Sequence, residues 1–209
     1  MYLAGDIGGT KTVLALFDEA HGPHRPLQER RFESDEYASF LDIVRAFSET
    51  TAVQPEAATL AVAGPVQGRR VQVTNLPWAI DADEVSQELG APLRLLNDLE
   101  SIANAVPMLE ADDLVTIKAG QAQPEQPIAV IAPGTGLGEA FLFWDGQKYR
   151  AIPSEGGHTD FAPATALELE LLRYWQPRMG HVSYERVCSG LGIPKLYEFL
   201  RETDRYPEP

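Results

Sequence analysis

Short apolar runs alternate along the chain with segments whose apolar residues recur every third or fourth position. The short runs predict strands, because a buried strand needs only about four to eight apolar residues. In the first half of the chain, strands are expected at 2–5, 12–17, 27–32, 58–63, 70–74 and 93–96. Helices are expected there at 37–47, whose apolar residues share one face, at 81–89 and at about 99–106.

A polar stretch that holds two prolines, 118–127, interrupts this pattern. Such stretches are typical of connections between domains. Beyond it, strands are expected at 128–132, 139–144 and 148–152, and helices at 164–179, 184–188 and 193–202. The alternation of strands and helices predicts an α/β fold.

Residues at three predicted helix ends have the chemistry of caps. Asp81 is expected to cap the helix at 81–89 with Glu84 as its capping-box partner, and Gly90 is expected to end that helix. Ser183 is expected to cap the short helix at 184–188, which would place Glu185 in the first helical turn.

Two glycine-rich hairpins resemble each other weakly. A shift of 127 residues places 9–18 on 136–145, and both segments then read as a glycine-rich turn followed by a strand with an acidic end. Chance similarity between any two hairpins explains the match equally well. A true repeat would mean that two similar domains each present a glycine-rich hairpin to a shared cleft.

Composition narrows the function classes. The chain has 209 residues, a formal net charge of -14, 44% hydrophobic residues and one cysteine, Cys188. The apolar content is sufficient for a packed core, and the negative charge argues against nucleic acid or an anionic membrane as partner. No apolar run is long enough to span a membrane, and the N-terminus does not read as a signal peptide. A cytoplasmic protein is therefore expected.

Two glycine loops are candidate phosphate sites. In Asp6-Ile7-Gly8-Gly9-Thr10, adjacent glycines let backbone N–H groups approach a bound oxygen, and Asp6 would hold magnesium directly or through water. The second loop, Gly134-Thr135-Gly136-Leu137-Gly138, lacks the dinucleotide-binding spacing and opens onto an expected strand. Neither loop is a Walker A motif, and an ordinary tight hairpin is the alternative for each.

Polar residues elsewhere add candidate chemistry. Asn97 and Asp98 follow an apolar strand, where ligands gather in α/β sheets, although either residue would also cap the next helix. A carboxylate there would accept a proton from a substrate hydroxyl during phosphoryl transfer. Glu155 and His158 flank two glycines in a loop that suits recognition of several hydroxyl groups better than metal ligation.

Seven motifs occur in a specific order that covers essentially the whole chain. They are DIGGT at 6–10, AGP at 63–65, TN at 74–75, LND at 96–98, GTGLG at 134–138, EGGHTDFAP at 155–163 and GHVSYERV at 180–187. This combination resembles the bacterial glucokinase family, ATP-dependent glucose 6-phosphotransferases of the actin/hexokinase/Hsp70 superfamily. The resemblance implies a ribonuclease H-like fold in two lobes, 1–108 and the first part of a second lobe at 109–209.

The resemblance also implies roles, substrates and partners. Asp98 would be the general base on the glucose 6-hydroxyl, and glucose, ATP with magnesium, and a possible second copy of the chain would be the partners. Sugar contacts would come from Asn97, Glu155, His158, Glu185, Thr74, Asn75 and Gly136. Phosphate and cofactor contacts would come from Asp6, Gly8, Gly9, Thr10, Thr135 and Gly136, with Asp6 in the magnesium shell.

The chain departs from the family pattern at three places. Lys11 is more typical of the neighbouring ROK family of sugar kinases and repressors, although the zinc-binding cysteine cluster of that family is absent. Pro133 stands where the repeat matches Asp6. Family members continue past residue 209, so the chain alone is expected not to be a competent kinase. A kinase for another hexose, and a truncated non-catalytic sugar-binding or regulatory protein, are the alternatives.

Overall fold

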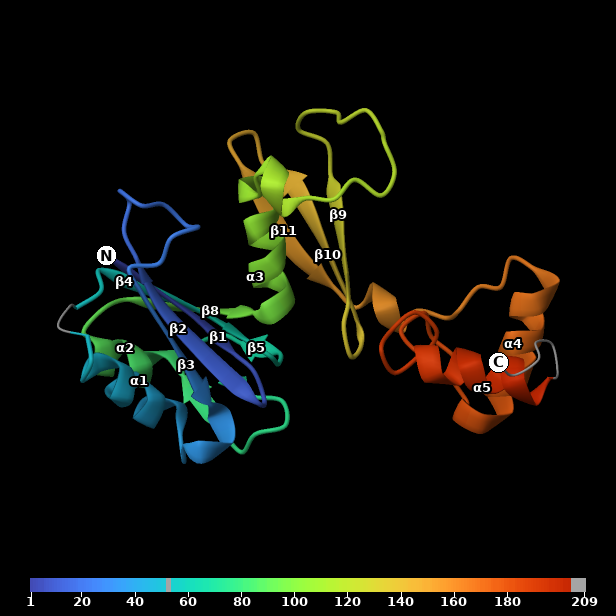
Figure 1. The fold of residues 1–209 in the computed structure, drawn as a ribbon, viewed down its shortest axis with the longest axis horizontal. Helices are drawn as coiled ribbons and strands as arrows, with labels where there is room; N and C mark the ends of the chain where they lie inside the picture. Colours follow the sequence, from blue (N-terminus) through green and yellow to red (C-terminus); the bar gives the residue numbers. More distant parts are fainter. Residues whose placement is uncertain (52–53, 204–209) are drawn as a thin grey trace. The chain divides into compact units, whose positions relative to one another are not determined.

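The computed structural model describes residues 1–51 and 54–203, which fall into two compact units (Figure 1). The first unit is Met1–Ser101 and the second begins at Ile102. The division lies inside α3 (Asp98–Ala105), whereas the family resemblance implied a first lobe that extends to residue 108. The polar stretch 118–127, expected as the connection, lies within the second unit.

The first unit is built on a five-stranded sheet in the order β3-β2-β1-β4-β8. Strands β1, β2 and β3 form an antiparallel meander, and β4 and β8 continue the sheet parallel to β1. The bounds are Tyr2–Ile7 for β1, Lys11–Phe17 for β2, Gln28–Glu33 for β3, Ala57–Val62 for β4 and Leu93–Asn97 for β8. Because β1, β4 and β8 are parallel, the segments that follow them emerge at the same edge of the sheet.

Two helices, α1 (Phe40–Ser48) and α2 (Ala82–Leu89), cover one face of this sheet (Figure 1). Ser39 caps α1 through a bond that its side chain accepts from Asp42 N. Asp81 caps α2 and Gly90 ends it in a left-handed conformation, as expected. The Asp81 side chain accepts its cap bond from Asp83 N, and the capping box with Glu84 stays a prediction. The core between the layers includes Ile7, Leu14, Ile43, Leu60, Val62 and Val85.

A small antiparallel sheet stands beside this core in the order β5-β6-β7. Its strands are Val66–Gln67, Arg70–Gln72 and Ala79–Asp81. The turn between β6 and β7 holds Thr74 and Asn75, and Asn75 adopts a positive φ of 65°. This small sheet thus carries the Thr74–Asn75 pair on a tight, conformationally restricted turn.

The second unit contains a three-stranded antiparallel sheet in the order β11-β10-β9 and two longer helices. Leu171, Trp175 and Phe199 of the helices pack with Val182 and Val187 of the intervening loop. Thr165 caps α4 with a full capping box to Glu168. The bounds are Ile128–Pro133 for β9, Leu137–Trp144 for β10, Tyr149–Ser154 for β11, Ala166–Met179 for α4 and Ile193–Glu202 for α5.

The expected short helix at 184–188 is wrong. Ser183 pairs with Asp160 in an isolated β-bridge, and the next residues form turns. Tyr184 N donates to Thr159 O and Glu185 N donates to Gly157 O. These two bonds tie the segment to the preceding loop. Val187 N and Cys188 N both donate to Tyr184 O, so the segment forms a single turn and not a helix.

The internal repeat appears in strand order but not in register. The meander β9-β10-β11 repeats the order of β1-β2-β3. Ile7 pairs with Thr12 across the first turn, which leaves four residues between them, whereas Pro133 pairs with Leu137 and leaves three. The shift of 127 residues therefore does not carry one hairpin onto the other. Among the described residues, no helix is long and apolar enough to cross a membrane.

Candidate functional site

The first glycine loop is fastened to the sheet by two buried hydroxyl groups. Gly8 N donates to Lys11 O at 2.9 Å and closes the turn between β1 and β2. Ser34 Oγ donates to Gly8 O at 3.0 Å, and Ser34 N donates to Thr10 O at 2.9 Å. Thr12 Oγ1 lies 3.0 Å from Ser34 Oγ, and both side chains are fully buried. Sequence reasoning missed Thr12 and Ser34, because single hydroxyl residues at strand ends carry no motif.

Gly9 lies directly against the Thr74–Asn75 turn. A Cβ atom on Gly9 would stand 2.9 Å from Thr74 O and 3.2 Å from Asn75 Cβ, so only glycine fits without a shift. Thr74 N in turn donates to Ala63 O at 2.8 Å, and Ala63 N donates to Ile7 O at 3.0 Å. The segments after β1, β4 and β6 are therefore linked in one layer at the carboxyl edge of the sheet.

Asn97 and Asp98 stand at the same edge, where β8 ends. Asn97 Nδ2 donates to Gly64 O at 3.2 Å, which ties β8 to the segment after β4. Leu99 N donates both to Asn97 Oδ1 at 3.0 Å and to Asp98 Oδ1 at 2.9 Å. Both side chains thus contribute to the start of α3, as the capping interpretation expected, while the Asp98 side chain remains exposed.

Asp6 shares this edge with Asp98. Loss of hydration raises the pKa of Asp6 above its ordinary value; the positive charge of Lys11 lowers it, and the negative charge of Asp98 raises it further. Carboxylate oxygens fit magnesium, which prefers oxygen ligands and keeps several waters. Among the described residues, no group of three or more His, Cys, Asp or Glu is placed to hold a metal by itself.

Replacing Asp6 by Asn is expected to raise the melting temperature at pH 7 by a small amount, because Asp6 keeps an exposed surface and loses only part of its hydration. A carboxyl with a raised pKa binds its proton more tightly in the folded state, so stability falls as pH rises from its ordinary 3.8 through the raised value. The gain from Asp6→Asn should therefore disappear below that interval. Thermal unfolding between pH 3 and pH 7 measures the difference in melting temperature between the variant and the unsubstituted protein, with Asp18→Asn as control.

The control variant is expected to shift the melting temperature in the opposite direction. Hydrogen bonds from His21 hold the pKa of Asp18 below its ordinary value, so Asp18→Asn should lower the melting temperature at pH 7. An Asp6→Asn variant that melts below the unsubstituted protein at pH 7 would contradict the desolvation of Asp6.

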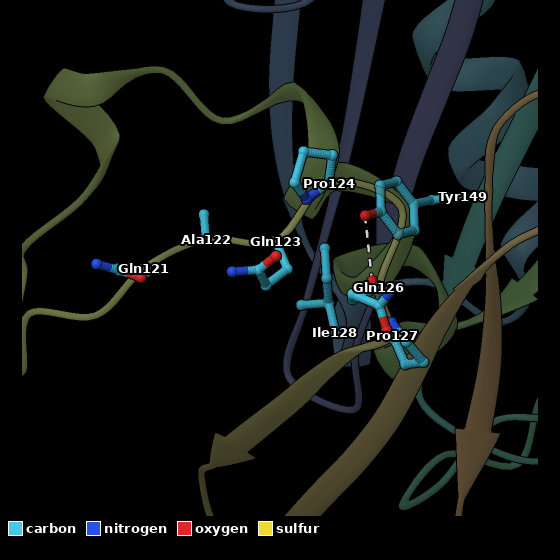
Figure 2. Close-up of a pocket in the computed structure, with 8 residues that line it drawn as sticks. All are labelled: Gln121, Ala122, Gln123, Pro124, Gln126, Pro127, Ile128 and Tyr149. Carbon is cyan, nitrogen blue, oxygen red and sulfur yellow. Dashed lines mark hydrogen bonds between the residues drawn. The ribbon is translucent and has the colours of Figure 1, made fainter.

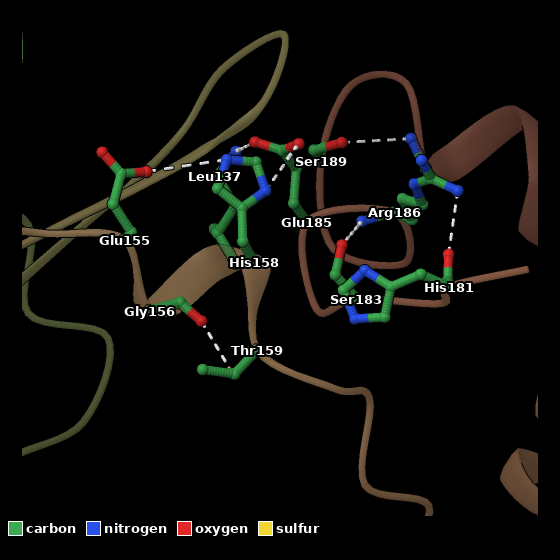
Figure 3. Close-up of polar contacts among 11 residues, drawn as sticks. Leu137, Glu155, Gly156, His158, Thr159, His181, Ser183, Glu185, Arg186 and Ser189 are labelled. Atoms are coloured by element: carbon green, nitrogen blue, oxygen red, sulfur yellow. Dashed lines mark hydrogen bonds and ion pairs between the residues drawn. The ribbon is translucent and has the colours of Figure 1, made fainter. Parts of the chain in front are cut away.

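In the second unit, Glu185 is held against the second glycine loop (Figure 3). Its Oε2 accepts a bond from Leu137 N at 3.1 Å, and its own N donates to Gly157 O at 2.8 Å. A Cβ atom on Gly136 would overlap Glu185 Oε2, and one on Gly157 would overlap Leu137 O. The two glycines therefore allow a close approach that other residues would block.

His158 lies between two carboxylates (Figure 3). His158 Nδ1 is 3.6 Å from Glu185 Oε1, and His158 Nε2 is 3.6 Å from Glu155 Oε2. The Glu155 side chain is 91% exposed, whereas that of Glu185 is 30% exposed. Two carboxylates and one imidazole thus lie close together, and both kinds of group can bind hydroxyls.

The second glycine loop is also hydrogen-bonded to the segment between α4 and α5. Gly190 N donates to Gly134 O at 2.8 Å, and Leu191 N donates to Thr135 O at 3.3 Å. Arg186 Nη1 donates to His181 O at 2.8 Å, which braces the loop that carries Glu185 (Figure 3). Thr135, Gly136, Glu155, His158 and Glu185 are therefore gathered within the second unit, as the residues from Asp6 to Asp98 are within the first.

A surface hollow is lined by none of these residues (Figure 2). It has a volume of about 580 Å³ and is formed by the exposed segment around Pro124 together with Ile128 and Tyr149. Tyr149 OH donates to Gln126 O at 3.1 Å across it. It contains no charged side chain among its lining residues, so it adds nothing to the predicted site.

A known protein family matches nearly the whole chain. The profile of a family described as Glucokinase matches residues 3–209. Glucokinase from Nostoc sp. (strain PCC 7120 / SAG 25.82 / UTEX 2576) is 41% identical over 208 residues, which cover 97% of this chain and 61% of the relative. The chain thus spans about three fifths of the length of this curated relative.

Two solved structures are similar. The glucokinase from an Antarctic psychrotroph superimposes with a TM-score of 0.88 at 36% identity, and covers 100% of this chain and 66% of its own. The glucokinase from Balamuthia mandrillaris, solved in complex with glucose, gives a TM-score of 0.73 at 28% identity over 97% of this chain and 63% of its own.

Proposed function

Because the chain belongs to the glucokinase family, we propose that its residues serve the transfer of the γ-phosphoryl group of ATP to the 6-hydroxyl of D-glucose. The products are glucose 6-phosphate and ADP. The observation that carries this proposal is the edge shared by Asp98, Asp6 and the Gly8–Thr10 turn. A proton acceptor and a phosphate-binding turn are the two things that phosphoryl transfer to a hydroxyl needs.

In the proposed reaction, glucose O6 attacks the γ-phosphorus while the bond from that phosphorus to the ADP oxygen breaks. The O6 proton passes to the exposed carboxylate of Asp98, which acts as general base. Backbone N–H groups of Gly9 and Thr10 would contact the phosphates, as would Thr135 and Gly136. Magnesium bound with ATP would neutralise phosphate charge, and the Asp6 carboxylate would hold it through water.

Sugar recognition is proposed for the polar side chains of both units. Asn97 would donate from its amide, while the carboxylates of Glu155 and Glu185 would accept bonds from sugar hydroxyls. His158 would meet a further hydroxyl, with Thr74 and Asn75 bordering the substrate. A site of this kind discriminates strongly, because a sugar that lacks one hydroxyl leaves a polar group unmatched. The single cysteine suits a reducing compartment, and we place the activity in the cytoplasm.

Replacing Glu185 by Gln is expected to weaken glucose binding by roughly 10- to 100-fold, because a hydrogen bond to a charged group contributes about 1.5–3 kcal/mol. Titration calorimetry of the chain with glucose measures this. Glu84→Gln, on the exposed face of α2, is the matched control and should leave the affinity unchanged.

Two results would count against the proposed function. One is equal glucose affinity in the Glu185→Gln and Glu84→Gln variants. The other is tighter binding of mannose, fructose or an N-acetylhexosamine than of glucose in the same titration, which would assign a different hexose to the site.

A further inference from the structure

Lys11 directly follows the Gly8–Thr10 turn, at the edge of the first sheet where β1 ends. Thr12 is fully buried in the core, so its neighbours Lys11 and Val13 lie on the opposite face of β2. Asp6 of β1 pairs directly with Val13, which places Asp6 on this same face. Lys11 is therefore the diagonal cross-strand neighbour of Asp6, a separation that a long side chain can span.

The charge of Lys11 acts on the candidate site and is not used by a salt bridge. Loss of hydration raises the pKa of Asp6, and the positive charge of Lys11 opposes that rise. Glu33 of β3 stands opposite Lys11, but its carboxylate binds Arg31 Nη2 at 3.2 Å. Within residues 1–51 and 54–203, no salt bridge holds the ammonium group of Lys11. This exposed side chain is therefore available to a ligand.

An available cation at this edge has a specific use in a chain of this charge. The net charge of -14 repels a polyanion such as ATP, and Lys11 is the only lysine among residues 1–101. Backbone N–H groups carry only partial charges, whereas a lysine ammonium brings a full charge and three donors. In phosphoryl transfer, a cation beside the transferred group stabilises the negative charge spread over its oxygens.

We propose that Lys11 is a further catalytic residue, whose ammonium binds the terminal phosphoryl group of magnesium-ATP beside Asp6 and the Gly8–Thr10 turn. This role rests on the proposed function and names the side chain that distinguishes the triphosphate donor from the diphosphate product. Lys11 forms no covalent bond and gives up no proton. The phosphorus exchanges its bond to the ADP oxygen for one to the sugar oxygen, and the sugar proton still passes to Asp98.

Titration calorimetry of the 209-residue chain with magnesium-ATP and with magnesium-ADP tests this role. Lys11→Gln should weaken ATP binding by roughly tenfold or more, because it removes a charge-assisted hydrogen bond. The same substitution should change ADP binding by less than about twofold, since ADP lacks the terminal phosphoryl group. Lys11→Arg keeps the charge and should retain most of the ATP affinity. Lys118→Gln is the matched control, because it removes an exposed lysine that lies outside the turn.

The salt dependence of binding separates a charge contact from a change in the shape of the turn. ATP affinity should fall more steeply with added salt in the unsubstituted chain than in Lys11→Gln, because salt screens the contact that the variant lacks. Circular dichroism of each variant verifies that the fold is intact, which is expected because the Lys11 side chain is exposed.

Three results would overturn the role of Lys11. They are equal ATP affinity in Lys11→Gln and Lys118→Gln, an equal loss for ATP and ADP, and binding of neither nucleotide by the unsubstituted chain. Glucose titrated into the same proteins tests the proposed function separately. If every variant binds glucose, these results remove only Lys11 from the site, whereas an unsubstituted chain that binds no glucose counts against the proposed function itself.

Discussion

The Asp98→Asn variant is expected to phosphorylate glucose about 10²- to 10⁴-fold more slowly than the unsubstituted protein, while its affinity for glucose stays within about twofold. The amide keeps the shape of the side chain and can still accept the bond from Leu99 N, but it cannot take up the O6 proton. A general base contributes an acceleration of about this size. ADP release in the presence of glucose and magnesium-ATP measures the rate, in a fusion of this chain to the part of the psychrotroph glucokinase that the match does not cover.

The control is Asp112→Asn, an exposed aspartate that lies outside the predicted site and should not change the rate. Calorimetry with glucose on the same two variants separates binding from turnover. An Asp98→Asn protein that turns over as fast as the control would refute the assignment of Asp98 as the base.

The Gly157→Ala variant is expected to lose glucose affinity by roughly tenfold or more and to melt at a lower temperature. Gly157 is buried, and a methyl group there would overlap the carbonyl of Leu137, which is backbone and has no rotamer with which to yield. Overpacking of this kind costs about 1–3 kcal/mol. The resulting shift would disturb the two hydrogen bonds that hold Glu185. Its Oε2 accepts one of them from Leu137 N, and its N donates the other to Gly157 O.

The neighbouring glycine provides the comparison. A methyl group on Gly156 would meet the carboxylate of Glu139 and Ser154 Oγ, which are the movable ends of side chains. Gly156→Ala should therefore change glucose affinity and melting temperature much less. Equal losses in the two variants would show that the close packing at Leu137 does not decide the geometry of the loop.

Most strands and long helices could be predicted from apolar periodicity. The limits of α5 agree with the expected 193–202, and the hairpin of β1 and β2 follows from the apolar runs around the glycines. The expected helix at 184–188 is only a single turn, in which Cys188 N donates to Tyr184 O. The bonds from Tyr184 N and Glu185 N to the preceding loop are long-range contacts that local propensity does not encode. The division at Ser101 likewise depends on packing and not on the prolines near residue 124.

For the candidate site, the sequence indicated the residues in distinctive motifs but not the residues that hold them in place. Asn97 and Asp98 could be placed at a strand end because the apolar run before them is clear. The adjacent glycines before His158 predicted a loop, but that Gly157 meets Leu137 O required the fold. Thr12 and Ser34 carried no signal, since a hydroxyl residue is as common at an ordinary strand end.

The buried pair Thr12 and Ser34 has a consequence for affinity. Fixing the backbone of one residue costs about 1–2 kcal/mol of conformational entropy. Because Ser34 bonds to both Gly8 O and Thr10 O, this ordering is completed when the chain folds and not when a phosphate arrives. The turn is thus preorganised, and phosphate binding should lose little entropy in shaping it.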